Sequence, residues 1–181
     1  AGGVVNKPLL VGGVATSVLA LDVATKGLVQ RSFELGESLP VVGDVVRLTY
    51  ILNPGAAFGI SLGPHSRFAF GALTVVATAV IVLMVRRTPS ARPVSLVALA
   101  LILGGAVGNL FDRIRHPGGV VDFVDVGFGS LRWPIFNVAD MSVTCGAILL
   151  ILLLQAERPE TAAEAPAAGR APDGAPGSTG T

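Results

Sequence analysis

"WPIFNVADMSVTCGAILLILLLQA", residues 133–156, is the stretch that decides the fold of this chain. It is 24 residues long, and Asp140 is its only charged residue. About 20 mainly apolar residues are enough for an α-helix to cross a bilayer, so the stretch predicts a spanning helix. A carboxylate in such a helix costs free energy unless it is paired or used, which makes Asp140 a candidate functional residue.

The composition predicts a membrane protein. Of the 181 residues, 51% are hydrophobic and 14% are charged, and the mean hydropathy is +0.71. Soluble domains carry about 25% charged residues. The first apolar segment could be a cleaved signal peptide because Lys7 precedes it, but Asp22 and Lys26 would be unusual there, and no small-residue cleavage site is evident. We therefore expect an all-α membrane protein with four transmembrane helices, at residues 8–30, 68–85, 93–111 and 133–156.

The segments between the spans predict a small extramembrane β element. Residues 41–53, "VVGDVVRLTYILN", are rich in β-branched residues and predict two short strands around a turn, within an extramembrane region of about 31–66. The loop 53–62 contains Gly55 and Gly59, which would allow the backbone to approach a substrate closely. "HPGG" at 116–119 predicts another turn.

The chain is expected to divide into a membrane domain, residues 1–156, and a C-terminal tail. Residues 157–181 are rich in Ala, Pro and Gly and lack large apolar side chains, so we predict that they are disordered. Lys and Arg residues divide evenly between the two sides of the membrane. The three arginines of the short 86–92 loop place that loop inside, which predicts cytoplasmic N- and C-termini.

The polar residues of the spans and loops fall at one membrane level. With four spans, the chain leaves spans one and three on the same face and enters spans two and four from it. A cluster at one end is typical of a single site at the membrane–water boundary. The residues at this level are Asp22, Lys26, Asn53, Asn109, Asp112, Arg113, Asp122, Asn137 and Asp140.

Structural roles remain open for several of these residues. Asp22 and Lys26 are four apart on a helix, so they can form an ion pair that fixes helix packing. Asp112 and Arg113 could pair with each other and anchor the helix at the interface. Asp140 could cap a helix or serve as its first-turn acid.

Other features predict little chemistry. His65 and His116 are expected to be lone loop histidines, Asp125 to be solvated, and Cys145 to be a small buried residue. No clustered ligands indicate a metal site, and a cation held by two carboxylates alone would be weak. The net charge of +1 gives no indication of a nucleic-acid partner. The spacing Gly104-x-x-x-Gly108 predicts close helix packing.

Asp122 and Asp140 could act together if the fold brings them into contact. Two carboxylates within hydrogen-bond reach share a proton, because both cannot ionise easily. The ionised carboxylate activates water and the protonated one polarises a carbonyl, as in aspartic proteases.

Five motifs occur in an order that resembles a known family. They are "LDVATKGLV" (21–29), "NPGAAFGI" (53–60), "GGAVGNLFDRI" (104–114), "VVDFVDV" (120–126) and "FNVAD" (136–140). Over residues 8–155 the chain closely resembles the lipoprotein signal peptidases, or signal peptidase II. The resemblance implies a bacterial membrane aspartyl endopeptidase with four transmembrane helices, a β-sheet cradle and a lid-like helix. Such an enzyme removes signal peptides from prolipoproteins, N-terminal to the diacylglyceryl-modified cysteine of the lipobox.

The resemblance also assigns roles to residues. The catalytic dyad falls on Asp122 and Asp140, and Asn109 and Asn137 are expected to orient carboxylates or backbone. No cofactor is implied, whereas membrane lipids and the antibiotic globomycin are implied as partners and inhibitor. The implied location is the bacterial cytoplasmic membrane, with the active site at its outer face. The implied supporting residues are Asp22, Lys26, Asn53, Asn109, Asp112, Arg113 and Asn137.

Two other functions compete with this one. A small transporter or channel subunit could use Asp22, Lys26 and Asp140 as an ion relay, but polar residues would then spread through the membrane depth. A non-catalytic assembly factor would tolerate Asp122→Asn and Asp140→Asn.

Overall fold

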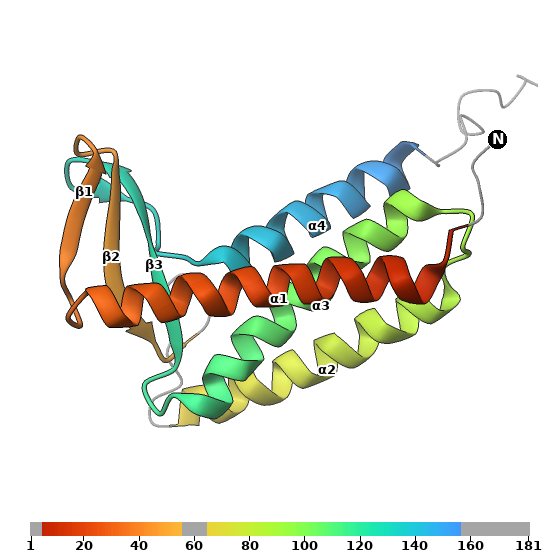
Figure 1. The fold of residues 1–181 in the computed structure, drawn as a ribbon, viewed down its shortest axis with the longest axis horizontal. Coiled ribbons are helices and arrows are strands. Elements are labelled where there is room, and N and C mark those ends of the chain that lie inside the picture. The colour runs from red at the N-terminus through yellow and green to blue at the C-terminus, as the bar shows by residue number, and fades with distance from the viewer. Residues whose placement is uncertain (1–4, 56–64, 157–181) are drawn as a thin grey trace, which may run out of the picture.

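Four long helices form a bundle capped at one end by a small sheet (Figure 1). The computed structural model describes residues 5–55 and 65–156, so the predicted tail and most of the 53–62 loop lie outside the described residues. The helices are α1 (Lys7–Ser32), α2 (Ser66–Arg87), α3 (Pro93–Arg115) and α4 (Val138–Ala156). All four are long and apolar enough to cross a membrane, which confirms the predicted spans.

Local sequence signals set where the helices begin. The side chain of Asn6 accepts a hydrogen bond from the Leu9 amide (3.2 Å) and caps α1. Pro93 is the first residue of α3, where its missing N–H costs nothing. The prediction for the fourth helix was five residues too long at its start. Residues 133–135 have no regular secondary structure, Phe136 forms a β-bridge with Val124, and α4 begins only after Asn137.

Helix α3 lies at the centre of the bundle and contacts the other three helices. Its small residues let the neighbours approach closely, as the Gly104–Gly108 spacing predicted. A Cβ on Gly104 would lie 2.8 Å from the Ala15 carbonyl oxygen of α1. One on Gly105 would overlap the Ala139 carbonyl oxygen of α4. The seam therefore lets both α1 and α4 pack closely against α3.

The sheet has four antiparallel strands in the order β1-β2-β3-β4. They are β1 (Ser38–Val42), β2 (Val46–Asn53), β3 (Val120–Phe128) and β4 (Leu131–Arg132). The predicted 41–53 hairpin is confirmed as β1 and β2, and the 116–119 turn leads into β3. Strand β3 was not predicted, since only the 116–119 turn was expected between the third and fourth spans. It pairs with β2, and Ile51 lies opposite Asp122.

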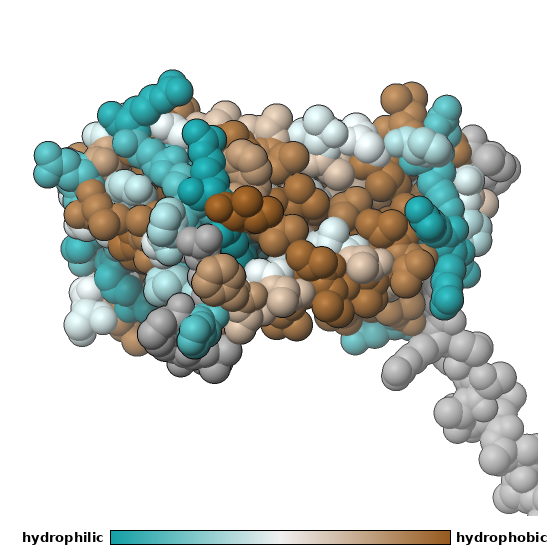
Figure 2. Space-filling model, turned by 90° about the horizontal axis from the view of Figure 1, so that it is seen from below, coloured by the Kyte–Doolittle hydropathy of each residue, from teal (hydrophilic) through white to brown (hydrophobic). Residues whose placement is uncertain are grey.

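The strands run across the end of the bundle, roughly perpendicular to the helices (Figure 1). A broad apolar belt covers the helices between polar groups at the two ends (Figure 2). Exposed apolar side chains on the helices, such as Leu73 and Val76, are 62% and 60% exposed and belong to this lipid-facing belt. The sheet therefore lies beyond the belt, on one side of the membrane.

Candidate active site

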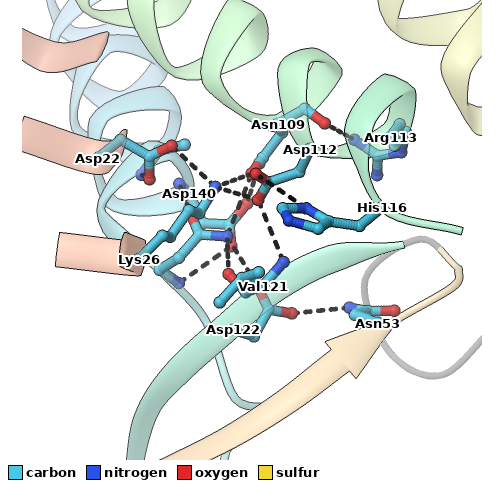
Figure 3. A network of polar contacts seen from close by, with 12 residues as sticks. Asp22, Lys26, Asn53, Asn109, Asp112, Arg113, His116, Val121, Asp122 and Asp140 are labelled. Carbon is cyan, nitrogen blue, oxygen red and sulfur yellow. Dashed lines mark hydrogen bonds and ion pairs between the residues drawn. The ribbon is translucent and has the colours of Figure 1, made fainter. Parts of the chain in front are cut away.

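Asp122 and Asp140 line the same pocket, although they come from different parts of the fold (Figure 3). Asp122 lies on β3 outside the membrane belt, and Asp140 lies in the first turn of α4. The pocket has a volume of about 870 Å³ and also contains Asn53, Asn109 and Arg113. The structure thus brings together the two carboxylates that the sequence analysis named.

The start of α4 fixes the position of Asp140. The Asn137 side-chain oxygen accepts a hydrogen bond from the Asp140 amide (2.9 Å), and the Asp140 carboxylate accepts one from the Asn137 amide (3.2 Å). These reciprocal bonds form a capping box, in which both residues satisfy free N–H groups of the helix terminus. Asp140 is therefore a first-turn acid, as the structural alternative held, and it also faces the pocket. The two interpretations of this residue are compatible.

Three asparagine amides point donor groups at the two carboxylates. Asn137 donates to Asp122 (2.6 Å) and Asn53 donates to the other Asp122 oxygen (2.9 Å). Asn109 donates to Asp140 (2.8 Å) and accepts a bond from Asn137 (3.1 Å). Each amide oxygen is engaged elsewhere, which fixes the orientation of the donors.

The orientation of the Asn53 side chain is set by the segment that follows β2. Its side-chain oxygen accepts the Gly55 amide (3.0 Å), so its NH₂ group is left for Asp122. This contact makes Asn53, the last residue of β2, a donor for a buried carboxylate.

Lys26 holds the buried supporting groups together. Its ammonium lies 2.8 Å from Asp22, 2.9 Å from Asp112 and 3.0 Å from the Asn109 side-chain oxygen. The predicted Asp22–Lys26 pair is confirmed. Asp22 also accepts the Ala139 amide (2.9 Å), which ties α1 to the beginning of α4.

The expected Asp112–Arg113 pair is wrong. Adjacent helical residues point about 100° apart, so they cannot share a face. Asp112 turns toward α1 and accepts both Lys26 and the Val121 amide (3.1 Å), which places β3. Arg113 turns into the pocket and donates to the Asn109 carbonyl oxygen of its own helix (3.2 Å).

Burial and charge together perturb the pKa of Asp122. Its side chain is almost completely buried, with 1% of the residue exposed. This desolvation, with a smaller contribution from the nearby Asp140 carboxylate, raises the pKa of Asp122 to about 7, against its usual 3.8. The donors Asn53 and Asn137 lower the pKa of Asp122 and offset only part of that rise. This carboxyl therefore stays partly protonated up to near-neutral pH.

Three further expectations were wrong. Asp125 is 5% exposed rather than solvated, and it accepts bonds from Arg132 (2.6 Å) and Thr49 (3.1 Å) across the sheet. Cys145 is exposed on α4 and lines the pocket wall. His116 is not a lone loop histidine.

His116 belongs to the polar network next to the site. One ring nitrogen lies 3.6 Å from Asp112 and the other 3.2 Å from the Gln30 amide nitrogen. Its i, i+4 spacing from Asp112 was the signal that could have placed it. Among residues 5–55 and 65–156, no group of three or more His, Cys, Asp or Glu side chains could hold a metal ion.

Known proteins share this sequence and fold. The lipoprotein signal peptidase of Moorella thermoacetica is 44% identical over 137 residues, covering 76% of this chain and 87% of that protein. The lipoprotein signal peptidase of Brevibacillus brevis is 45% identical over 139 residues, covering 77% and 90%. A bacterial membrane enzyme solved by the in meso method at 2.3 Å resolution superposes with a TM-score of 0.74 at 32% identity, covering 81% of this chain and 88% of that one.

A family model described as signal peptidase (SPase) II matches residues 14–155. This range includes all four helices and all four strands except the first seven residues of α1 and the last residue of α4. It also contains both pocket carboxylates and every buried residue that orients them. By this match the chain belongs to the signal peptidase II family of multi-pass membrane peptidases.

Proposed function

We propose that this protein is a membrane aspartyl endopeptidase that removes the signal peptide from diacylglyceryl-modified prolipoproteins. It cuts on the N-terminal side of the lipidated cysteine. The observation that carries the proposal is the shared pocket of Asp122 and Asp140, in which amide donors hold both carboxylates. Family membership supports the substrate class.

The two carboxylates divide the chemistry by their surroundings. The dyad shares one proton, which we assign to Asp122 because burial raises its pKa to about 7. Asp140 accepts a proton from a water molecule as the water oxygen attacks the scissile carbonyl carbon. Asp122 gives its proton to the carbonyl oxygen, forming a tetrahedral diol.

Collapse of the diol completes the reaction. The diol returns a proton to Asp122 as the C–O double bond re-forms, and Asp140 gives its proton to the departing amine. The C–N bond breaks, and the dyad again holds one proton. Asn109 and Asn137 keep each carboxylate oriented, because both are hydrogen bonded to dyad oxygens.

The walls of the pocket suit a lipid-bearing peptide. Ile51 and Val120 come from the sheet, and Met141 and Val143 line the pocket beside the dyad on α4. The pocket therefore meets the sheet on one side and the lipid-facing helix on the other. A peptide bond at the membrane surface can reach the acids while acyl chains remain in an apolar environment.

The ion-relay alternative is less well supported. Within the described residues, the buried charged side chains all lie at the sheet end of the bundle: Asp22, Lys26, Asp112, Asp122 and Asp125. A path for ions would need polar groups along the whole membrane depth.

We further infer that the protein resides in the bacterial cytoplasmic membrane, with cytoplasmic termini and the site at the outer face. We also infer that globomycin inhibits it.

The decisive experiment is cleavage of a diacylglyceryl-modified prolipoprotein by the purified protein in detergent. Asp122→Asn and Asp140→Asn should each abolish the gel shift. Asp125→Asn is the matched control, because it makes the same change on β3 outside the pocket, and it should retain cleavage. Parent-like cleavage by either dyad variant would disprove the dyad.

Two further arms test the substrate and the tail. Unmodified prolipoprotein should be cut much more slowly, and equal rates would refute the dependence on lipid. Deletion of 157–181 should leave cleavage intact, since the predicted site residues all precede it.

A further inference from the structure

A second pocket lies on the other side of α3 from the dyad. Its volume is about 690 Å³, and the C-terminal ends of α1 and α3 enclose it. Asn109 and Arg113 line the first pocket, whereas Phe111 and Asp112 of the same helix line the second. The signal-peptide cleavage proposed above does not involve the exposed residues that line this second pocket, such as Arg31 and Arg115.

The polar side of this pocket carries uncompensated positive charge. Arg31 and Arg115 are both exposed, and neither has an acidic partner within 4.0 Å among the described residues. The acid in the lining, Asp112, is already engaged by Lys26 and the Val121 amide.

The helix ends do not cancel this charge. Each of the two helix C-termini adds at most about half a negative charge. Two arginines therefore leave a surplus of about one positive charge, which matches one phosphodiester.

The other side of the pocket is apolar and faces lipid. Val23, Leu28 and Phe111 are 38%, 63% and 40% exposed, on spanning segments of α1 and α3. The Arg115 guanidinium lies 5.8 Å from the centre of the Phe111 ring, at the boundary between the two sides. Arg31 and Arg115 lie in the last turns of their helices, the depth at which arginine meets lipid head groups.

We propose that this pocket binds the phosphodiester head group of an anionic phospholipid. Arg31 and Arg115 bind the phosphate oxygens, for which the planar guanidinium is well shaped. Val23, Leu28 and Phe111 contact the start of the acyl chains. A soluble phosphate would use only the polar half, so the apolar half favours the lipid as the source of the anion.

Brominated-lipid quenching tests this at the site itself. Leu28→Trp places a fluorophore on the apolar wall at a position that already faces lipid, and the parent protein gives the background from Trp133. Reconstituted protein is titrated with brominated phosphatidylglycerol or brominated phosphatidylcholine of equal chain length. Because each interfacial arginine attracts anionic lipid, the preference for phosphatidylglycerol at this tryptophan should be on the order of tenfold at low salt and should shrink as salt is raised.

Variants separate the site from general surface charge. Arg31→Gln with Arg115→Gln should reduce the preference to about onefold, and the two Arg→Lys changes should retain part of it. The control is Arg86→Gln with Arg87→Gln, an equal charge change at the exposed end of α2 that lies away from the pocket, and it should keep the preference. Equal quenching by both lipids, or an unchanged preference in the Arg31/Arg115 variant, would overturn the proposal. Displacement of the brominated lipid by millimolar inorganic phosphate would assign the site to a soluble anion instead.

Discussion

Asp122→Asn should abolish cleavage and yet make the protein more stable at alkaline pH. In the folded protein burial raises the pKa of Asp122 from 3.8 to about 7. Between these two pH values the folded state keeps a proton that the unfolded chain releases. The stability that this carboxyl contributes is therefore present below about pH 4 and is lost as pH rises to 7. A difference of about three pKa units corresponds to about 4 kcal/mol of unfolding free energy.

The asparagine variant avoids this loss but gives up a hydrogen bond. Its side chain stays neutral at every pH. Asn53 and Asn137 both donate to the native carboxylate, whereas an amide offers only one acceptor oxygen, so one contact is lost at about 1–2 kcal/mol. We expect the variant to be more stable than the parent by about 2–3 kcal/mol at pH 8. At pH 5 the two should be nearly equal, because the parent has by then lost only about 1–2 kcal/mol and the lost hydrogen bond offsets this.

The measurement is unfolding in mixed micelles by SDS titration, followed by far-ultraviolet circular dichroism at both pH values. A thiol-reactive dye is unsuitable, because Cys145 is already exposed in the folded state. Cleavage of lipid-modified substrate is measured on the same preparations. A stability difference of the same sign and size at pH 5 and pH 8 would refute the raised pKa of Asp122.

Four other outcomes follow from contacts in and around the site. The kcat should fall about tenfold per pH unit above pH 7, as Asp122 loses its proton, and a flat kcat profile to pH 9 would contradict this. Lys26→Met should cost about 3–5 kcal/mol in the SDS titration, because it leaves buried carboxylates unpaired. Gly105→Ala should destabilise by about 1–3 kcal/mol through overlap with α4, whereas Gly13→Ala, which meets no atom within 4 Å, should be neutral or stabilising. Asn137→Ala should lower kcat roughly 10²–10³-fold with little change in KM, and should cost about 1–2 kcal/mol of stability as a lost cap.

The sequence predicted the features of the fold that depend on a local residue pattern, or on the side of the membrane at which each span begins and ends. Apolar runs of the right length, with few or no charged residues, indicated the four spans. Counting the sides on which spans begin and end placed Asp22, Asn109 and Asp140 at one level, because a helix crossing has only two possible ends. Asp22 and Lys26 were paired correctly, since i, i+4 residues share a helix face.

What the sequence analysis missed depended on contacts between distant segments. Strand β3 forms because β2 supplies its hydrogen-bonding partners, and those strands are separated by two helices in the chain. The burial of Asp125 follows from the same pairing, since Thr49 and Arg132 reach it only once the sheet has formed. The late start of α4 could have been predicted from the sequence, because Pro134 and the capping residue Asn137 both disfavour an earlier start.

The division of the dyad between β3 and α4 links activity to assembly. The strand folds in water, whereas the helix must be inserted into lipid and is the last of the four spans to leave the ribosome. Under the proposed mechanism neither half carries a competent site alone, because one carboxyl of the dyad comes from the strand and the other from the helix. A chain whose final span has not entered the bilayer, or whose sheet has not docked, is thus inert. On this proposal, membrane insertion and docking of the sheet together control when the protein becomes active.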